Sequence, residues 1–147
     1  MVCLGNICRS PLAEGIMLRE IEAHDLDWSV DSAGTGSWHV GEAPDKRSIA
    51  VAKANKIDIS KQRARKFTAA DLDAFDLILA MDSSNFNNIL SKASSESQKE
   101  KVKIILNFVY PGQNRSVPDP YYNGSFEEVF NLLDKACKEI ITQYAIQ

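Results

Sequence analysis

The sequence has little of three things that point to particular classes of protein: long apolar runs, an excess of basic charge, and cysteine. No stretch approaches the roughly 18 apolar residues that span a bilayer, and no basic segment followed by an apolar core opens the chain. We therefore expect a cytoplasmic protein without membrane insertion. The formal net charge of -3 argues against nucleic acid as a partner, because such proteins usually carry a basic excess. The basic cluster KQRARK at 61–66 is more typical of a solvated loop or helix end.

The three cysteines, Cys3, Cys8 and Cys137, form an odd set in a chain of 147 residues, which is long enough to fold without disulfide bonds. We expect them to be reduced. Neither a metal nor a cofactor is expected, since Cys3 and Cys8 lack a ligand cluster and His24 and His39 have no metal-ligand spacing to them. A nucleotide-binding phosphate loop is not indicated either, because no lysine follows the glycine of the first loop.

Apolar patterning predicts strands that alternate with helices. We expect strands at 1–4, 28–32, 76–81 and 101–109. We expect helices at 11–24, 45–56, 83–93 and 126–144. The remaining segments are a short helix or turn at 67–75, a loop at 94–100 and an irregular segment at 110–124. This alternation implies a single α/β domain over residues 1–147. We expect a flavodoxin-like or Rossmann-like three-layer sandwich, with a central four-stranded parallel sheet and helices on both faces. Ligands of such sheets bind beyond the carboxyl ends of the strands.

The stretch CLGNICRS at 3–10 joins the first expected strand to the first expected helix. A strand, a glycine-containing loop and a helix N-terminus together form an anion site, because unpaired backbone amides and the positive end of the helix dipole point to one place. Arg9 adds a planar set of donors suited to two phosphate oxygens. The same groups favour the thiolate of Cys3 as a nucleophile, which predicts transfer of phosphate to sulfur. The alternative is a buried cysteine beside a capped helix start.

Cys3, Arg9 and Ser10 match the C-x5-R-S signature of phosphatases with a cysteine nucleophile. The fuller string VCLGNICRSPLAE resembles the low-molecular-weight protein tyrosine phosphatases, as do VDSAGTGSWHVGEAPDKRS, FDLILAMDSSN and VPDPYYNGSFEEV. The resemblance implies hydrolysis of phosphotyrosine, in proteins and in small aryl phosphates, through a phosphocysteine intermediate and without a metal. Tyrosine-phosphorylated proteins are the partners it implies, and we expect a monomer or a weak dimer.

Asp119 lies between Pro118 and Pro120, whose restricted backbone favours a stiff, extended course that can hold a carboxyl over a pocket. Taken alone, the segment is more typical of a solvated turn. In the family that the sequence resembles, the aspartate of the DPYY motif is the general acid, and Asp119 matches it. By this resemblance Asp119 protonates the departing phenol and then, as a carboxylate, activates the water that hydrolyses the phosphocysteine.

The resemblance implies further site residues. It places the phosphate in a cradle formed by Leu4, Gly5, Asn6, Ile7, Cys8, Arg9 and Ser10. Asn6 is expected to hold a strained backbone with Ser32 in its hydrogen-bond network, and Ser10 to assist the departing thiolate or to cap the helix. Trp38, Tyr121 and Tyr122 are candidate walls for an aromatic ring, or partly packed core residues. Ile7 favours phosphotyrosine, since related arginine phosphatases carry threonine there.

By the same resemblance, Cys8 is expected to trap an oxidised Cys3 as a reversible disulfide; the alternative is that it packs the loop. Two features depart from the family pattern. Gln62 stands near the position of a common histidine, and few apolar residues precede Cys3, so we expect the central first strand to pair weakly. Either the true chain begins earlier or this version is compromised. These departures leave open a phosphotyrosine-binding module without turnover. An arsenate reductase on the same fold would need another cysteine, and we expect Cys137 to be buried in the last helix.

Overall fold

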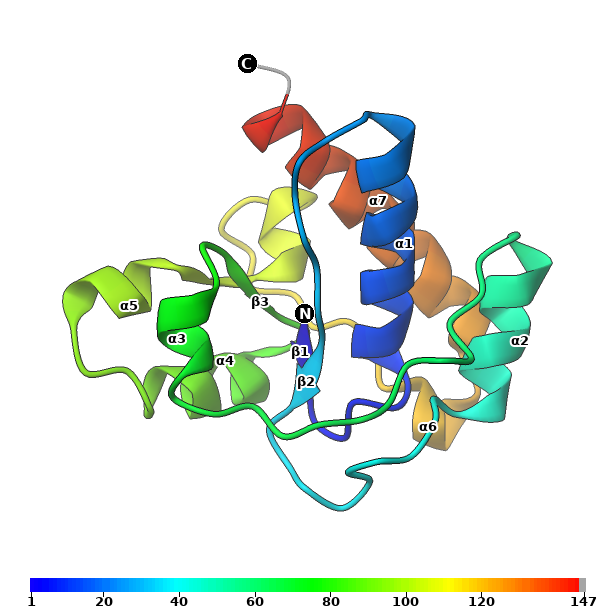
Figure 1. Ribbon diagram of the computed structural model, residues 1–147, viewed down its shortest axis with the longest axis horizontal. Helices are drawn as coiled ribbons and strands as arrows, with labels where there is room; N and C mark the ends of the chain where they lie inside the picture. Colours follow the sequence, from blue (N-terminus) through cyan, green and yellow to red (C-terminus); the bar gives the residue numbers. More distant parts are fainter. Residues whose placement is uncertain (146–147) are drawn as a thin grey trace.

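The computed structural model describes residues 1–145 and is built on a four-stranded parallel sheet (Figure 1). The strands are β1 (Val2–Cys3), β2 (Ala33–Gly34), β3 (Ile78–Ala80) and β4 (Val102–Ile104), in the order β2-β1-β3-β4. Val2 pairs with Ala33 on one side and with Ala80 on the other, so the short first strand is central, as expected. The parallel α/β architecture predicted from the sequence is confirmed.

Helices cover both faces of this sheet (Figure 1). They are α1 (Arg9–Ala23), α2 (Lys46–Ala54), α3 (Asp71–Ala74), α4 (Ser83–Leu90), α5 (Glu96–Glu100), α6 (Pro120–Asn123) and α7 (Phe126–Tyr144), with the 3-10 helix η1 (Ile105–Phe108) after β4. Helices α1, α2 and α7 pack together on one face, and α3 and α4 lie on the other. The loops after β1 and β2 gather at one end of the sheet, near α6 (Figure 1).

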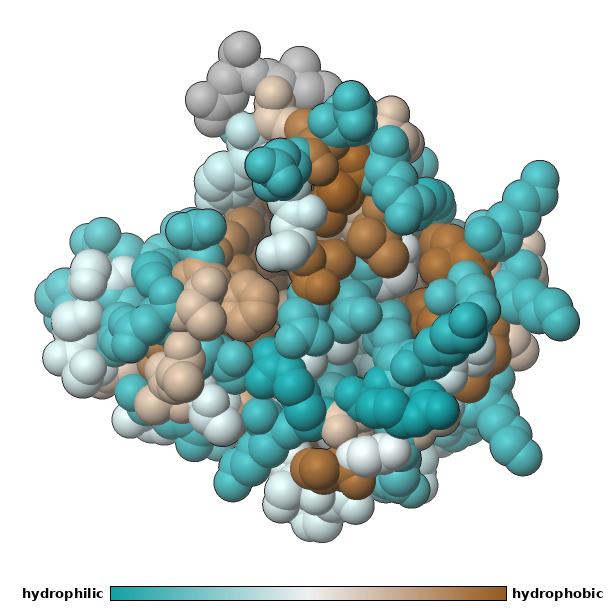
Figure 2. Space-filling view, in the orientation of Figure 1, coloured by the Kyte–Doolittle hydropathy of each residue, from teal (hydrophilic) through white to brown (hydrophobic). Residues whose placement is uncertain are grey.

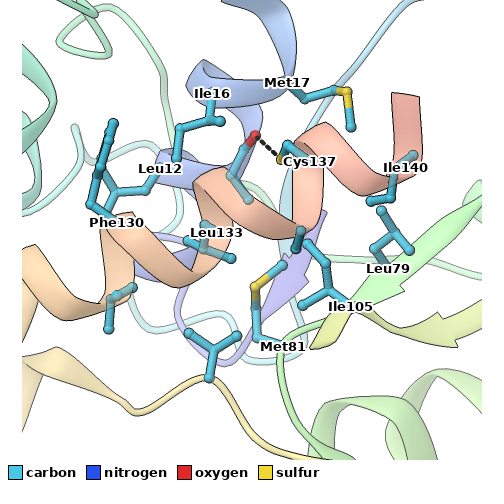
Figure 3. Packing of buried hydrophobic residues seen from close by; sticks show 14 of the residues in the cluster. Leu12, Ile16, Met17, Leu79, Met81, Ile105, Phe130, Leu133, Cys137 and Ile140 are labelled. Atoms are coloured by element: carbon cyan, nitrogen blue, oxygen red, sulfur yellow. Dashed lines mark hydrogen bonds between the residues drawn. The ribbon is translucent and has the colours of Figure 1, made fainter. Parts of the chain in front are cut away.

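The main core lies between α1, α7 and the sheet (Figure 3). Leu12 and Ile16 of α1 meet Leu133 and Ile140 of α7, and Leu79 points toward them from β3. Neighbouring residues of β3 alternate between the faces, because Ile78 and Ala80 belong to the cluster on the other side of the sheet. Cys137 is fully buried in the main core, as expected.

The predicted strand at 28–32 is wrong, because β2 begins only at Ala33. A strand needs a partner alongside it, and the ladder of β1 begins with Val2 opposite Ala33. The residues just before β2 therefore have no strand of the sheet beside them. Instead, the carbonyl of Asp31 accepts a hydrogen bond from the amino group of Met1 at 3.0 Å.

Three other segments also differ from the sequence prediction. The strand expected at 101–109 ends at Ile104 and continues as η1, since its buried apolar residues suit a helical turn as well as a strand. The loop expected at 94–100 contains α5, which Ser95 caps by accepting a hydrogen bond from the Gln98 N–H at 3.2 Å. The irregular segment at 110–124 contains α6.

Apolar side chains reach the surface mainly along α1, α2 and α7 in the view of Figure 2. None of the helices within residues 1–145 combines the length and apolar character that a membrane crossing requires. A cavity of about 540 Å³ lies at the amino end of the sheet, where Met1, Val30 and Leu77 contribute to its lining. None of residues 4–10 lines it, so this cavity is separate from the loop that the sequence singles out.

We expect Leu133→Ala to lower the free energy of unfolding by about 3 kcal/mol, because it leaves a cavity between α1 and α7 where the side chain is fully buried. Urea denaturation followed by circular dichroism measures this change. Lys135→Ala on the exposed side of α7 is the matched control and is expected to change stability by less than about 0.5 kcal/mol. Equal effects of the two substitutions would contradict the packing described here.

Candidate active site

The loop between β1 and α1 turns its carbonyl groups outward. Four of them accept hydrogen bonds from neighbouring segments: Cys3 O from Thr35 N at 2.9 Å, Leu4 O from Gly36 N at 2.9 Å, Ile7 O from Asp45 N at 2.8 Å and Cys8 O from Ser48 Oγ at 3.4 Å. Within residues 1–145, the N–H groups of five loop residues donate to no acceptor: Leu4, Gly5, Ile7, Cys8 and Arg9. Free amides of a loop that opens a helix are suited to receive an oxyanion, and the phosphate-binding role of this loop remains a prediction.

Cys3 lies at the carboxyl end of the central strand, at the base of this loop. Its Sγ accepts a hydrogen bond from the Asn6 N–H at 3.3 Å and lies 3.0 Å from Ser10 Oγ. The Asn6 N–H is thus a donor to this sulfur, and the Ser10 hydroxyl is close enough to donate to it as well. Ser10 thus contacts the sulfur, and it does not cap α1, whose capping position is Cys8.

Arg9 brings distant parts of the chain to the loop. Its guanidinium is buried, and Nη1 donates to Asp82 Oδ2 at 2.9 Å and to the carbonyl of Val117 at 3.0 Å. Nη2 lies 3.7 Å from Asp119 Oδ2. The structure therefore brings the Asp119 carboxyl to the Arg9 guanidinium, at the loop that begins with Cys3. The chemical roles expected for these three residues remain predictions. A nucleophile, a cation and a carboxyl around one cradle are suited to phosphoryl transfer.

Asp82 is a site residue that our sequence interpretation missed. It follows β3, the neighbour of β1, and so lies at the same end of the sheet as the loop. Its Oδ1 caps α4 by accepting a hydrogen bond from the Asn85 N–H at 2.7 Å, while Oδ2 binds Arg9. The available signal was an acidic residue directly after a buried strand, in the string LAMDSSN.

Asn6 has a left-handed backbone, with φ of 57°. Its side chain donates to Ser10 Oγ at 2.8 Å and to Ser32 Oγ at 3.0 Å, and accepts a hydrogen bond from the Arg65 N–H at 3.0 Å. Arg65 is itself held by ion pairs with Asp31 and Asp71. This network ties the loop to β2 and to the segment before α3, and it agrees with the roles expected for Asn6 and Ser32.

The expected aromatic walls are exposed. Tyr121 and Tyr122 contact each other edge to face, with ring centroids 5.1 Å apart, and Trp38 is 71% exposed, with its ring over Gly36. Trp38 belongs to the loop between β2 and α2, which forms a small apolar tip at the bottom of Figure 2. His39 of the same loop was not predicted. Its ring lies against Gly5, where a Cβ would be 3.2 Å from Cδ2.

Cys8 and Gln62 lie beside this centre. Burial raises the pKa of the Cys8 thiol to about 12, so it stays protonated at neutral pH, and its redox role remains a prediction. Gln62 donates from Nε2 to the carbonyl of Pro11 at 3.1 Å, so it supports the start of α1. Among residues 1–145, no group of three or more His, Cys, Asp or Glu side chains could hold a metal ion.

We expect Asn6→Ala to destabilise the fold by about 1 kcal/mol more than Asn6→Gly, because only glycine adopts the left-handed backbone without a steric cost. Both variants lose the three side-chain hydrogen bonds. Chemical denaturation of the two proteins gives the difference. Equal stabilities would mean that the backbone at this position is not strained.

We expect iodoacetamide at neutral pH to alkylate Cys3 ahead of the other cysteines. Cys3 is the predicted nucleophile, and its Sγ has the Asn6 N–H and the Ser10 hydroxyl as hydrogen-bonding neighbours. Burial raises the pKa of Cys8 and of Cys137 to about 12, which leaves both as unreactive thiols. Mass spectrometry of peptides over time measures the order, with inorganic phosphate as a protecting ligand in a parallel sample. Equally fast labelling of Cys8 would show that burial does not protect it.

Comparisons with known proteins agree with this geometry. A family model described as low molecular weight phosphotyrosine protein phosphatase matches residues 1–147. The low molecular weight phosphotyrosine protein phosphatase of Schizosaccharomyces pombe is 46% identical over 84% of this chain and 80% of its own length. The crystal structure of YfkJ from Bacillus subtilis superposes with a TM-score of 0.91 and 37% identity, covering 99% of this chain and 94% of that one. The crystal structure of a Drosophila arginine phosphatase, DARP, superposes with a TM-score of 0.90 and 31% identity, covering 98% of this chain and 95% of that one. The chain therefore belongs to the low molecular weight phosphotyrosine protein phosphatase family.

Proposed function

We propose that the protein is a protein tyrosine phosphatase that uses Cys3 as its nucleophile and Asp119 as general acid and base. The observation that carries the proposal is the meeting of three groups. The Asp119 carboxylate lies 3.7 Å from the Arg9 guanidinium, at the loop that begins with Cys3 and whose Asn6 N–H donates to the Cys3 sulfur. Family membership adds support, since the matching family model describes phosphotyrosine protein phosphatases.

In the first step the phosphate oxygens bind the loop amides and Arg9 Nη2, which leaves the phosphorus next to the Cys3 thiolate. The thiolate attacks phosphorus, and the bond between phosphorus and the phenolic oxygen breaks. Asp119, protonated at this stage, gives its proton to that oxygen, so the phenol departs neutral. The product on the enzyme is a phosphocysteine. The amides and Arg9 stabilise the charge that builds up on the equatorial oxygens.

In the second step the ionised Asp119 takes a proton from a water molecule while the water oxygen attacks phosphorus. The sulfur–phosphorus bond breaks, and the electron pair returns to Cys3 as a thiolate. Ser10 Oγ at 3.0 Å and the Asn6 N–H at 3.3 Å stabilise that leaving group. Inorganic phosphate leaves, and Asp119 is again protonated for the next cycle.

Phosphotyrosine is the substrate we favour over phosphoarginine, although DARP is structurally similar. Ile7 supports this choice, because an apolar side chain beside the cradle suits an aromatic ring better than a guanidinium. Exposed Tyr121 and Tyr122 next to Asp119 offer further aromatic contact, for proteins and for small aryl phosphates. The three free, buried cysteines support action in a reducing compartment, which we propose is the cytoplasm. A monomer or a weak dimer remains a prediction.

We expect hydrolysis of p-nitrophenyl phosphate near pH 6 to continue in the presence of a metal chelator. Cys3→Ser removes the nucleophile and is expected to abolish turnover. Asp119→Asn keeps an acceptor for the cap of α6 but carries no proton to give, so kcat/KM is expected to fall about 100-fold or more. Steady-state kinetics measures all three effects.

Asp27→Asn, at an exposed aspartate, is the matched control for loss of a carboxylate. Mass spectrometry after an acid quench should find phosphate on the peptide that contains Cys3. A folded protein that binds phosphate without any turnover would contradict the proposal and favour a binding module. Loss of activity with the chelator would contradict the metal-free mechanism, and arsenate-dependent oxidation of its thiols would support the reductase.

A further inference from the structure

The segment that carries Asp119 has few ties to the rest of the molecule. We call residues 118–125 the acid segment; it contains Asp119 and the four-residue helix α6. Its end is joined to α7, because Gly124 and Ser125 accept hydrogen bonds from the N–H groups of Phe126 and Val129. Among residues 1–145, two polar contacts tie it to segments distant in the sequence: the ion pair of Asp119 with Arg9, and a hydrogen bond from Arg47 Nη2 to the Tyr121 carbonyl at 3.3 Å. In the first step of the proposed mechanism Arg9 binds the substrate phosphate, so Arg47 becomes the remaining polar tie to a segment distant in the sequence.

Arg47 is fixed on the side of α2. Its Nε donates to Asp45 Oδ1 at 3.1 Å and its Nη2 to Asp45 Oδ2 at 3.0 Å, a two-point contact that sets the plane of the guanidinium. This hydrogen bonding from Arg47 lowers the pKa of Asp45, which stays ionised at neutral pH. The Asp45 N–H donates to Ile7 O at 2.8 Å, which connects Arg47, through Asp45, to the loop at 4–8 between β1 and α1, hereafter the phosphate loop.

Arg47 also packs against one aromatic ring of α6 and one of α7. Its Cζ lies 4.6 Å from the ring centroid of Phe126, a buried residue at the start of α7, and 5.6 Å from that of Tyr121. A flat guanidinium can stack on an aromatic ring and donate in its own plane at once, which a lysine cannot do. Tyr121 completes the connection, because its N–H donates to Asp119 Oδ1 at 3.1 Å while its carbonyl accepts from Arg47.

We propose that Arg47 is a positioning residue for the general acid: through Tyr121 it holds α6, and with it the Asp119 carboxyl, at a fixed place over the phosphate loop. This inference rests on the proposed role of Asp119. Arg47 itself contacts neither Cys3 nor Arg9 in the hydrogen bonds and ion pairs of residues 1–145. Its loss therefore weakens protonation of the leaving group while nucleophilic attack remains.

Two substrates separate these effects. Phenyl phosphate releases a phenol with a pKa near 10, which needs the acid, whereas 2,4-dinitrophenyl phosphate releases an acidic phenol that departs unprotonated. We expect Arg47→Ala to lower kcat/KM for phenyl phosphate about tenfold, and for 2,4-dinitrophenyl phosphate less than about twofold. Asp119→Asn should likewise lower kcat/KM for phenyl phosphate more than for 2,4-dinitrophenyl phosphate, and its effect on phenyl phosphate should be larger than that of Arg47→Ala. In the Asp119→Asn background, Arg47→Ala should add less than about a twofold loss, because the two residues act through one proton transfer.

Lys46→Ala is the matched control, since it removes an exposed positive charge from the adjacent position of α2 and should leave both substrates unaffected. Arg47→Lys keeps the charge and is expected to fail to restore phenyl phosphate hydrolysis. Thermal melting checks each fold, and Arg47→Gln replaces Arg47→Ala if the alanine variant does not fold.

Several results would overturn the inference. They are an equal loss on both substrates, no loss at all, full recovery with Arg47→Lys, or additive losses in the double variant. If Asp119→Asn itself shows no dependence on the leaving group, the proposed acid is wrong, and that failure is seen independently of the Arg47 variants.

Discussion

The buried guanidinium of Arg9 is the constraint around which the site is arranged. A charge removed from water is costly unless it is paired and hydrogen-bonded, and Arg9 meets that requirement with Asp82, the carbonyl of Val117 and, more distantly, Asp119. Those partners belong to segments far apart in the sequence. Pairing the single cation of Arg9 therefore holds these segments close together at the site. The order of the sheet makes this possible, because β3 is adjacent to β1 and delivers Asp82 beside the loop.

A network of hydrogen bonds and ion pairs centred on Asn6 fixes the conformation of the loop between β1 and α1. Asn6 contributes through its side chain, which connects the loop to Ser32, to Ser10 and to the backbone of Arg65. Arg65 is in turn paired with carboxylates on both sides. A left-handed backbone at Asn6 persists because these contacts over-determine it. Fixed dipoles of this kind stabilise developing charge without having to reorient during the reaction.

The sequence predicted the parts of the site whose geometry is local. Cys3 and Arg9 are separated by one short loop, so a strand end and a helix start were enough to bring them together. Asp119 required the family resemblance, since its own neighbours indicated only a stiff turn. Asp82 and Arg47 were missed because their contacts depend on strand order and on the packing of α2 beside α7, which apolar periodicity does not specify. The second strand was misplaced for a similar reason: residues at 28–32 have strand-like composition, but pairing depends on where β1 lies.

The outward carbonyls of the phosphate loop have a further consequence for how the protein handles its product. They are already engaged by Thr35 and Gly36 after β2 and by Asp45 and Ser48 at the start of α2, so the loop is held in shape before any anion binds. Backbone amides that are already fixed in place lose little entropy when an oxyanion binds to them, which favours rapid association. In the proposed mechanism the liberated phosphate occupies the same amides as the phosphate of the substrate, so the two compete for the loop. Turnover by such a mechanism depends on the concentration of inorganic phosphate around the protein.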